Sequence, residues 1–280
     1  MNTVLLTALF AAALAFVLGT ALGFFKKVFY VETDPRIARI RELLPGVNCG
    51  GCGYPGCDGY AAAVAGGSAE TTRCAPGGQG TASKLAALMG VSAEMKPVVA
   101  VVACKGSKDI APLKGLYAGI PTCRGAKLSA GGTKLCSWGC LGYGDCTAIC
   151  PFDAIHMGSD GLPHVDYEAC TGCKKCIAEC PQQIIKEVPR DRKGPIVSCS
   201  NRNPLRPMIR KTCKVGCIKC GICVKNCPEQ CIVIENGIPQ VDYAKCTSCG
   251  TCNAKCPTKI IVMLQNEVFA EADEKTQAAG

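Results

Sequence analysis

Cysteine is the residue type with the clearest chemistry in this sequence. The chain has 25 cysteines in 280 residues, and many are separated by only two or three residues. A disulfide scaffold explains this poorly, because the count is odd and such close neighbours cannot all reach disulfide geometry with one another. Closely spaced thiolates can instead converge on one metal centre. The spacing therefore predicts a protein built around metal–thiolate sites.

Three runs have the C-x2-C-x2-C-x3-C-P pattern of bacterial two-cluster ferredoxins. They are Cys170, Cys173, Cys176 and Cys180; Cys217, Cys220, Cys223 and Cys227; and Cys246, Cys249, Cys252 and Cys256. In this pattern the first three cysteines hold one [4Fe–4S] cluster and the fourth belongs to the other cluster of the pair. We therefore predict three crossed ligand sets. These are Cys150 with Cys170, Cys173 and Cys176; Cys217, Cys220 and Cys223 with Cys256; and Cys246, Cys249 and Cys252 with Cys227.

A fourth run, formed by Cys140, Cys146 and Cys150, is degenerate because Tyr143 occupies the place of the second ligand. Either the cluster at this site lacks one iron, or a nearby cysteine substitutes. We favour Cys136, four residues before Cys140, as the substitute. The predicted set is then Cys136, Cys140, Cys146 and Cys180. However, Cys213 occupies the equivalent position before the complete run at Cys217, where no substitute is needed.

A separate motif lies nearer the N-terminus, where Cys49, Cys52 and Cys57 alternate with glycines and Cys74 follows after sixteen intervening residues. The glycines permit tight turns and allow backbone amides to approach inorganic sulfides. Zinc sites favour two C-x2-C pairs, which this motif lacks. We predict a domain that holds one [4Fe–4S] cluster.

Five clusters account for twenty cysteines, and five cysteines remain. Cys231 aligns with Ala154 in the sequence repeat described next, which predicts a small buried residue. The other four are Cys104, Cys123, Cys199 and Cys213. They are either ligands of a sixth cluster or buried thiols, and the sequence leaves both interpretations open.

An internal repeat determines the predicted architecture. The ferredoxin runs recur after 76 or 77 residues, and the connection 162–167 recurs as 238–243. We predict an α+β protein of small iron–sulfur modules, in which a bacterial-type two-cluster ferredoxin fold is duplicated. The expected divisions are an anchor helix at 1–29, a one-cluster domain at 30–75, a linker at 76–97, a first module with an added strand segment at 98–192, a second module at 193–268 and a tail at 269–280.

Local signals predict three elements ahead of the ferredoxin runs. Asp34 and Pro35 are typical of a helix start, as N-cap and first helical residue. A second short helix is predicted at Gly59–Ala65, with Asp58 as its cap. The β-branched and small apolar residues of Val98–Ala103 predict a buried strand.

The first residues after the N-terminus predict a membrane anchor. Val4 to Phe25 contains no charge, and as a helix it would span roughly 33 Å, enough to cross the hydrocarbon core. A cleaved signal peptide is the alternative, but no basic residue precedes the apolar stretch. Lys26 and Lys27 follow it, and the positive-inside rule then places the rest of the chain in the cytoplasm.

The net charge of +9 suggests a nucleic-acid partner, which the sequence does not otherwise favour. Residues 190–219 contain nine basic residues and one acidic residue, but no aromatic side chain for stacking on bases. Each oxidised cluster with its four thiolates carries about −2, so five clusters would nearly cancel the charge of the polypeptide. The basic segment is instead expected to offset cluster charge or to dock an acidic ferredoxin. The sequence offers no recognisable catalytic set or dinucleotide fingerprint.

The apolar helix, the Cys49–Cys57 motif with Cys74, and the tandem ferredoxin modules together resemble the RnfB family of the Rnf complex, in its long form. That complex is a membrane-bound, ion-translocating ferredoxin:NAD oxidoreductase. The resemblance implies an inner-membrane protein that accepts electrons from soluble ferredoxin and passes them toward membrane and flavin-bearing subunits, where NAD reduction drives Na⁺ or H⁺ translocation. The alternatives are an anchored polyferredoxin of another redox complex and a zinc-stabilised membrane scaffold.

Overall fold

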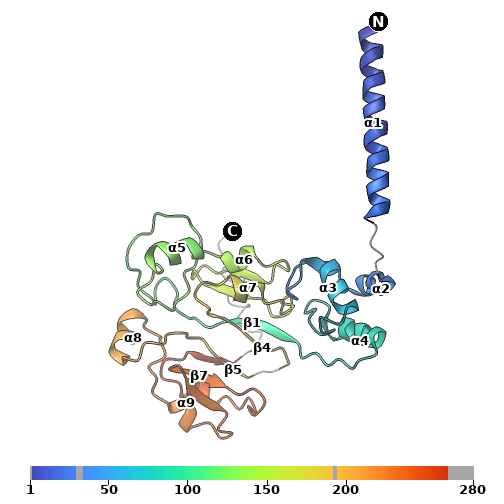
Figure 1. The fold of residues 1–280 in the computed structure, drawn as a ribbon. Coiled ribbons are helices and arrows are strands. Elements are labelled where there is room, and N and C mark those ends of the chain that lie inside the picture. The colour runs from blue at the N-terminus through green and yellow to red at the C-terminus, as the bar shows by residue number, and fades with distance from the viewer. Residues whose placement is uncertain (1, 30–33, 192–193, 264–280) are drawn as a thin grey trace, which may run out of the picture.

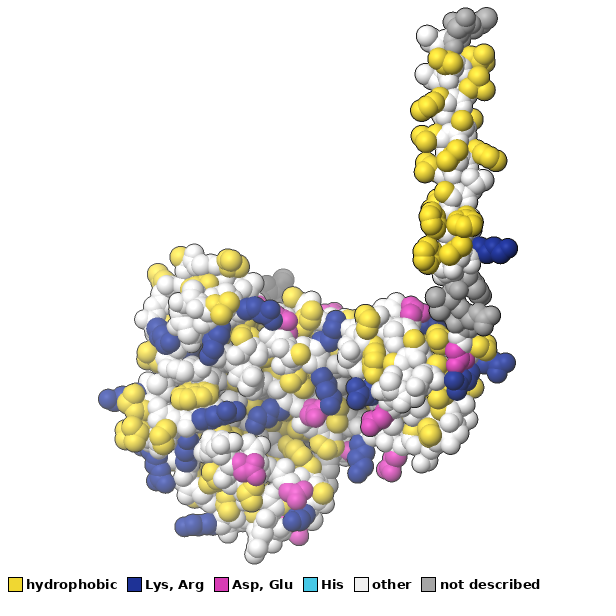
Figure 2. Space-filling model, viewed as in Figure 1, with side chains coloured by type: hydrophobic (Ala, Val, Ile, Leu, Met, Phe, Trp, Pro, Cys, Tyr) yellow, Lys and Arg dark blue, Asp and Glu magenta, His cyan; other side chains and the backbone are white. Residues whose placement is uncertain are grey.

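The computed structural model describes residues 2–29, 34–191 and 194–263. Helix α1 (Asn2–Val28) stands apart from the rest of the protein (Figure 1). Its segment Leu5–Val28 is long and apolar enough to cross a membrane, and none of it is buried against other parts of the chain. Figure 2 shows its apolar side chains exposed on the visible face. The predicted tail at 269–280 and the last residues of the predicted second module, 264–268, lie outside the described residues.

The one-cluster domain is a small helical unit around its own core. Its helices are α2 (Pro35–Leu43), α3 (Gly56–Ala65) and α4 (Gly78–Met89). The predicted start of α2 is confirmed, because the carboxylate of Asp34 accepts a hydrogen bond from the amide of Arg36 at 2.8 Å. Ile40, Tyr60 and Leu85, one from each helix, are completely or almost completely buried in this core.

Two local predictions in this domain differ from the structure. Helix α3 begins at Gly56 rather than Gly59, and Asp58 lies in its first turn, where it pairs with Arg41 at 2.8 Å instead of capping the helix. The expected linker at 76–97 contains α4, which packs against the domain through Leu85. The apolar pattern of these residues is weak, so the sequence indicates only a weak helical stretch at Ser83–Met89 and not that one face of the helix is buried.

The first ferredoxin module consists of two antiparallel strand pairs and short helices. The pairs are β1 (Val98–Val102) with β4 (Ile185–Pro189), and β2 (Ile155–Met157) with β3 (Pro163–Val165). The helices are α5 (Cys123–Ala130), α6 (Asp145–Ala148) and α7 (Lys175–Glu179). The predicted strand is confirmed as β1. It ends at Val102, and the amide of Ala103 still donates to the carbonyl of Ile184 at 2.7 Å.

The second module has the same order of strand pairs. They are β5 (Pro195–Val197) with β8 (Ile261–Met263), and β6 (Ile232–Glu235) with β7 (Ile238–Val241). Its helices are α8 (Arg206–Thr212), α9 (Ile222–Lys225) and α10 (Thr251–Lys255). The amide of Ser198 donates to the carbonyl of Ile260 at 2.7 Å, just as Ala103 donates to Ile184. Each module has an apolar core into which its cysteines are packed.

Candidate iron–sulfur sites

All 25 cysteines are free thiols, and most of them are gathered in groups of four. Among residues 2–29, 34–191 and 194–263, no group of three or more His, Cys, Asp or Glu side chains is close enough to hold a single metal ion. A tetrahedral zinc site, with Zn–S bonds of about 2.3 Å, requires its sulfurs to converge on one point. The groups of four thiols fit a larger centre with thiolates spread around it, as in a four-iron cluster.

In the one-cluster domain, the loop before α3 brings its cysteines to Cys74. The side-chain oxygen of Asn48 accepts a hydrogen bond from the amide of Cys57 at 2.8 Å and so fixes the loop against the helix start. Burial raises the pKa of the Cys74 thiol, and the nearby thiols of Cys57, Cys52 and Cys49 raise that pKa further. The structure therefore brings together the four cysteines predicted for this domain.

A second group is formed by Cys150, Cys170, Cys173 and Cys176. Burial raises the pKa of Cys176 to about 12, and the other three thiols of the group contribute to this shift. The amide of Ala100 in β1 donates to the sulfur of Cys170 at 3.5 Å, and that of Ala154 donates to Cys150 at 3.4 Å. The set predicted by crossing the two runs is thus assembled in space, with amides directed at its sulfurs.

Cys123 lies beside the cysteines of the degenerate run, where the spacing did not predict it. Cys123, Cys140, Cys146 and Cys180 line one hollow. The carboxylate of Asp145, at the start of α6, accepts hydrogen bonds from the amides of Cys123 at 2.8 Å and Arg124 at 3.1 Å. This side chain joins the first turn of α5 to the first turn of α6, and so brings Cys123 to the hollow.

Cys136, which was expected to complete this set, lies elsewhere in the structure. It lines a different hollow, together with Cys104, Cys199 and Cys213. Tyr143 does not face the cluster position either. Its ring packs edge-on against Tyr117, with centroids 5.8 Å apart. The physical reason is that the segment after β1 folds back over the module and delivers both Tyr117 and Cys123.

Two sequence signals pointed to this arrangement. Cys136 and Cys213 are 77 residues apart, the same interval as Cys140 and Cys217, so the two residues were candidates for one shared role. The predicted sixth set therefore also changes by one member, since Cys136 takes the place of Cys123 beside the other three thiols. Cys123 itself is the one cysteine between Cys104 and Cys136, in the segment that has no counterpart in the second module.

The second module gathers its cysteines in two further hollows. Cys217, Cys220, Cys223 and Cys256 line one, and Cys227, Cys246, Cys249 and Cys252 line the other, which are the crossed sets predicted from spacing. Cys231 is buried and also lines the second hollow, with its sulfur 3.4 Å from that of Cys227. Cys249 is the one exposed cysteine of the chain, and its hydrogen bond with Thr251 lowers its pKa.

The groups in the first half of the molecule follow one another closely. A Cβ atom added to Gly51 would lie 2.7 Å from the carbonyl oxygen of Cys173, so the one-cluster loop touches the first module. The thiol of Cys49 contributes to the raised pKa of Cys173, whose first cause is burial. The thiol of Cys146 likewise contributes to the pKa of Cys176. The three groups therefore form a continuous series.

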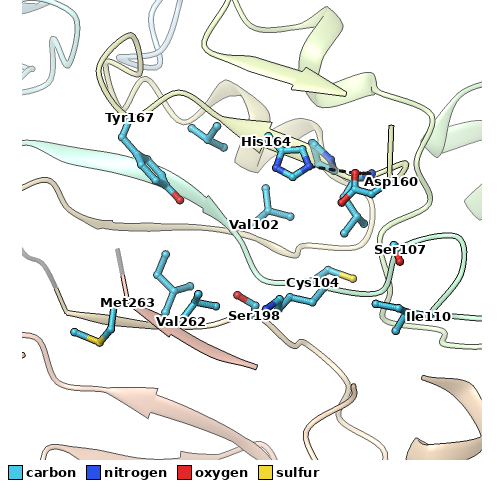
Figure 3. Close-up of a pocket in the computed structure, with 15 residues that line it drawn as sticks. Val102, Cys104, Ser107, Ile110, Asp160, His164, Tyr167, Ser198, Val262 and Met263 are labelled. Atoms are coloured by element: carbon cyan, nitrogen blue, oxygen red, sulfur yellow. Dashed lines mark hydrogen bonds and ion pairs between the residues drawn. The ribbon is translucent and has the colours of Figure 1, made fainter. Parts of the chain in front are cut away.

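A cavity of about 420 Å³ opens between the two ferredoxin modules, with Cys104 on its wall (Figure 3). Val102 and His164 border it from the first module, and Val262 and Met263 border it from the second. Nε2 of His164 lies 3.1 Å from the carboxylate of Asp160. This hydrogen-bond contact accounts for the position of the His164 ring on the cavity wall.

Comparison with known proteins assigns iron–sulfur families to three segments. An Fe–S cluster family matches residues 44–76, a 4Fe-4S binding domain matches residues 162–185 and a 4Fe-4S dicluster domain matches residues 216–260. These segments include the one-cluster loop and three of the cysteine runs.

Full-length relatives extend the comparison to most of the chain. It is 44% identical to the B component of the Na⁺-translocating ferredoxin:NAD⁺ oxidoreductase complex of Acetobacterium woodii, over 88% of this chain and 73% of that protein. It is 40% identical to the proton-translocating counterpart of Clostridium ljungdahlii, over 86% and 85%. It is 36% identical to the B component of the ion-translocating oxidoreductase complex of Methanosarcina acetivorans, over 84% and 88%.

Proposed function

Because the chain belongs to the RnfB family of the Rnf complexes, the ion-translocating ferredoxin:NAD oxidoreductases, we propose that it is their electron relay between soluble ferredoxin and the membrane. It is an iron–sulfur subunit, because three segments along the chain match families that bind iron–sulfur clusters. The observation that carries the proposal is the continuous series of four-thiol groups, beginning at the domain next to the apolar helix.

We assign [4Fe–4S] clusters to five groups. They are Cys49, Cys52, Cys57 and Cys74; Cys150, Cys170, Cys173 and Cys176; Cys123, Cys140, Cys146 and Cys180; Cys217, Cys220, Cys223 and Cys256; and Cys227, Cys246, Cys249 and Cys252. Each cluster, when bound, accepts and returns one electron at a time. The polypeptide contributes burial and amide donors such as those of Ala100, Ala154 and Ser248, which tune the potential at which that happens.

The apolar helix α1 supports an anchor in the inner cell membrane. Lys26 and Lys27 at its C-terminal end favour a cytoplasmic position for the cysteine domains by the positive-inside rule. Electrons would then travel from the cytoplasmic modules toward the membrane, where other membrane and flavin-bearing subunits reduce NAD and move Na⁺ or H⁺. An anchored polyferredoxin serving another redox complex is the alternative function, and the family membership favours the Rnf assignment.

The basic segment supports docking of an acidic ferredoxin at the second module. Arg202, Arg206 and Arg210 are exposed, and Lys and Arg side chains are visible over and around α8 (Figure 2). The guanidinium of Arg206 donates to the carbonyl of Lys219 at 3.2 Å, next to Cys220. A positive surface beside a cluster site raises the association rate of a negatively charged donor.

The test is to reverse these three arginines to Glu and to measure oxidation of reduced ferredoxin by the anaerobically purified full chain at several ionic strengths. We expect a rate at least about tenfold lower at low salt, with a flatter salt dependence. The control reverses Arg39, Lys84 and Lys96, which are also exposed but lie nearer the anchor, and should leave the rate nearly unchanged. Equal rates and salt slopes for all three proteins would rule out docking at α8. A chain that ferredoxin cannot reduce would contradict the proposed function itself.

A further inference from the structure

Four cysteines outside the five assigned groups meet where the two ferredoxin modules face each other. We call this place the seam. Its hollow is lined by Cys104 and Cys136 from the first module and by Cys199 and Cys213 from the second. We propose that the seam holds a sixth [4Fe–4S] cluster, which carries electrons from the cluster pair of one module to that of the other. This inference rests on the proposed relay function and adds a site and a path to it.

The seam is built from equivalent positions of the two modules. The sulfur of Cys104 accepts a hydrogen bond from the amide of Cys140 at 3.4 Å, and the sulfur of Cys199 accepts one from the amide of Cys217 at the same distance. Cys140 and Cys217 are themselves equivalent residues of the repeat. Cys104 and Cys199 therefore hold the same place in their modules, although 95 residues separate them.

The other two thiols are related in the same way. Cys136 and Cys213 each precede the first cysteine of a run by four residues. The carbonyl of Cys136 accepts a hydrogen bond from the amide of Gly139 at 3.1 Å, and that of Cys213 accepts one from Gly216 at 3.3 Å. Two pairs of matching thiols thus face each other across the seam. Three of these thiols are buried and Cys104 is half-buried. Four thiols contributed equally by two modules match the donor set that a cubane requires.

A buried polar side chain also lines this hollow. Asn201 is 3% exposed, and its Nδ2 donates to the sulfur of Cys136 at 3.6 Å. The hollow therefore supplies a hydrogen-bond donor to one of its own thiols.

The seam also lies between two of the assigned groups. The amide of Cys140 contacts the sulfur of Cys104, and the amide of Cys217 contacts the sulfur of Cys199, each at 3.4 Å. The sixth cluster would therefore receive an electron from the Cys217 group and release it to the Cys140 group. One electron enters and one leaves, and no bond or proton changes place. Without it, the relay would have no cluster between the modules.

The experiment replaces Cys104 and Cys213 by Ser, one at a time, in the anaerobically purified full chain. Because the two residues come from different modules, we expect each variant to lose about four irons and the same EPR signal, and to keep the signals of the other clusters. After ferredoxin reduces the second module, reduction of the first module should slow in both variants. The buried residue Thr133, which lines none of these hollows, is replaced by Ser as the control and should keep the full iron content.

A variant that retains every ligand gives a second measurement. Asn201→Asp keeps the oxygen that accepts from the amide of Asn203 but removes the donor to the sulfur of Cys136. We expect one cluster, and only one, to shift to a lower midpoint potential. Unchanged iron in both cysteine variants, with no shifted potential in N201D, would overturn the seam cluster while leaving the five-cluster relay intact. A wild-type chain without iron would instead overturn the proposed function.

Discussion

At the scale of single residues, Tyr143 shows how a lost ligand is replaced. The second position of the run holds a phenol, and its ring packs against Tyr117 instead of facing the hollow. The same segment that provides Tyr117 places Cys123 on the hollow, where Asp145 fixes its amide. The cluster site is therefore completed from outside the run. This arrangement favours a full set of four ligands over a cluster that lacks one iron.

This replacement can be tested by removing the Cys123 thiol and introducing a cysteine at position 143. We expect Cys123→Ser to lose or alter one cluster, with up to about four irons missing. Adding Tyr143→Cys in that background restores the ordinary run and should restore the iron and the EPR signal. Cys136→Ser should leave this signal in place and remove that of the seam. If Cys136→Ser abolishes the signal and Cys123→Ser does not, the assignment from the sequence is correct and the one made from the structure is wrong.

At the scale of elements, spacing predicted the ligand sets that depend on local geometry. The crossed sets follow from a short helix between the third and fourth cysteines of each run, and the structure brings the same thiols together in the second module. The position of Cys123 could not be predicted in this way. It depends on how residues 105–135 fold back, and that segment lacks a clear hydrophobic period. For a related reason the sequence predicts only a weak helical stretch at Ser83–Met89, where the structure has the longer α4, because these residues are mostly small.

The contact between the one-cluster loop and the first module gives a prediction at this scale. Gly51→Ala would place a methyl group 2.7 Å from the carbonyl oxygen of Cys173, so the two loops must separate. We expect weaker magnetic coupling between these two clusters in EPR spectra of the reduced protein, a loss of roughly 1–3 kcal/mol in stability and unchanged iron content. Gly80→Ala, in α4, meets no atom within 4 Å and is the matched control. Identical spectra for the two variants would show that the loops are not in contact.

At the scale of the whole molecule, the six proposed clusters would form one path for electrons. It runs from the one-cluster domain beside the apolar helix, through the first module and the seam, to the second module with its exposed Cys249. Six clusters at about −2 each would carry about −12 in total, which more than offsets the formal charge of +9 on the polypeptide. The sequence left a sixth cluster open with three of the four seam cysteines, but it named Cys123 where the structure has Cys136, because only the docking of the two modules brings the four together.

The measurement that tests this account most directly is quantitation of iron, acid-labile sulfide and zinc in the anaerobically purified full-length chain. Six [4Fe–4S] clusters predict about 24 irons and about 24 sulfides per chain, with no stoichiometric zinc. Reproducible saturation at about 20 irons would contradict the continuous six-cluster path. Zinc in place of iron would contradict the relay altogether.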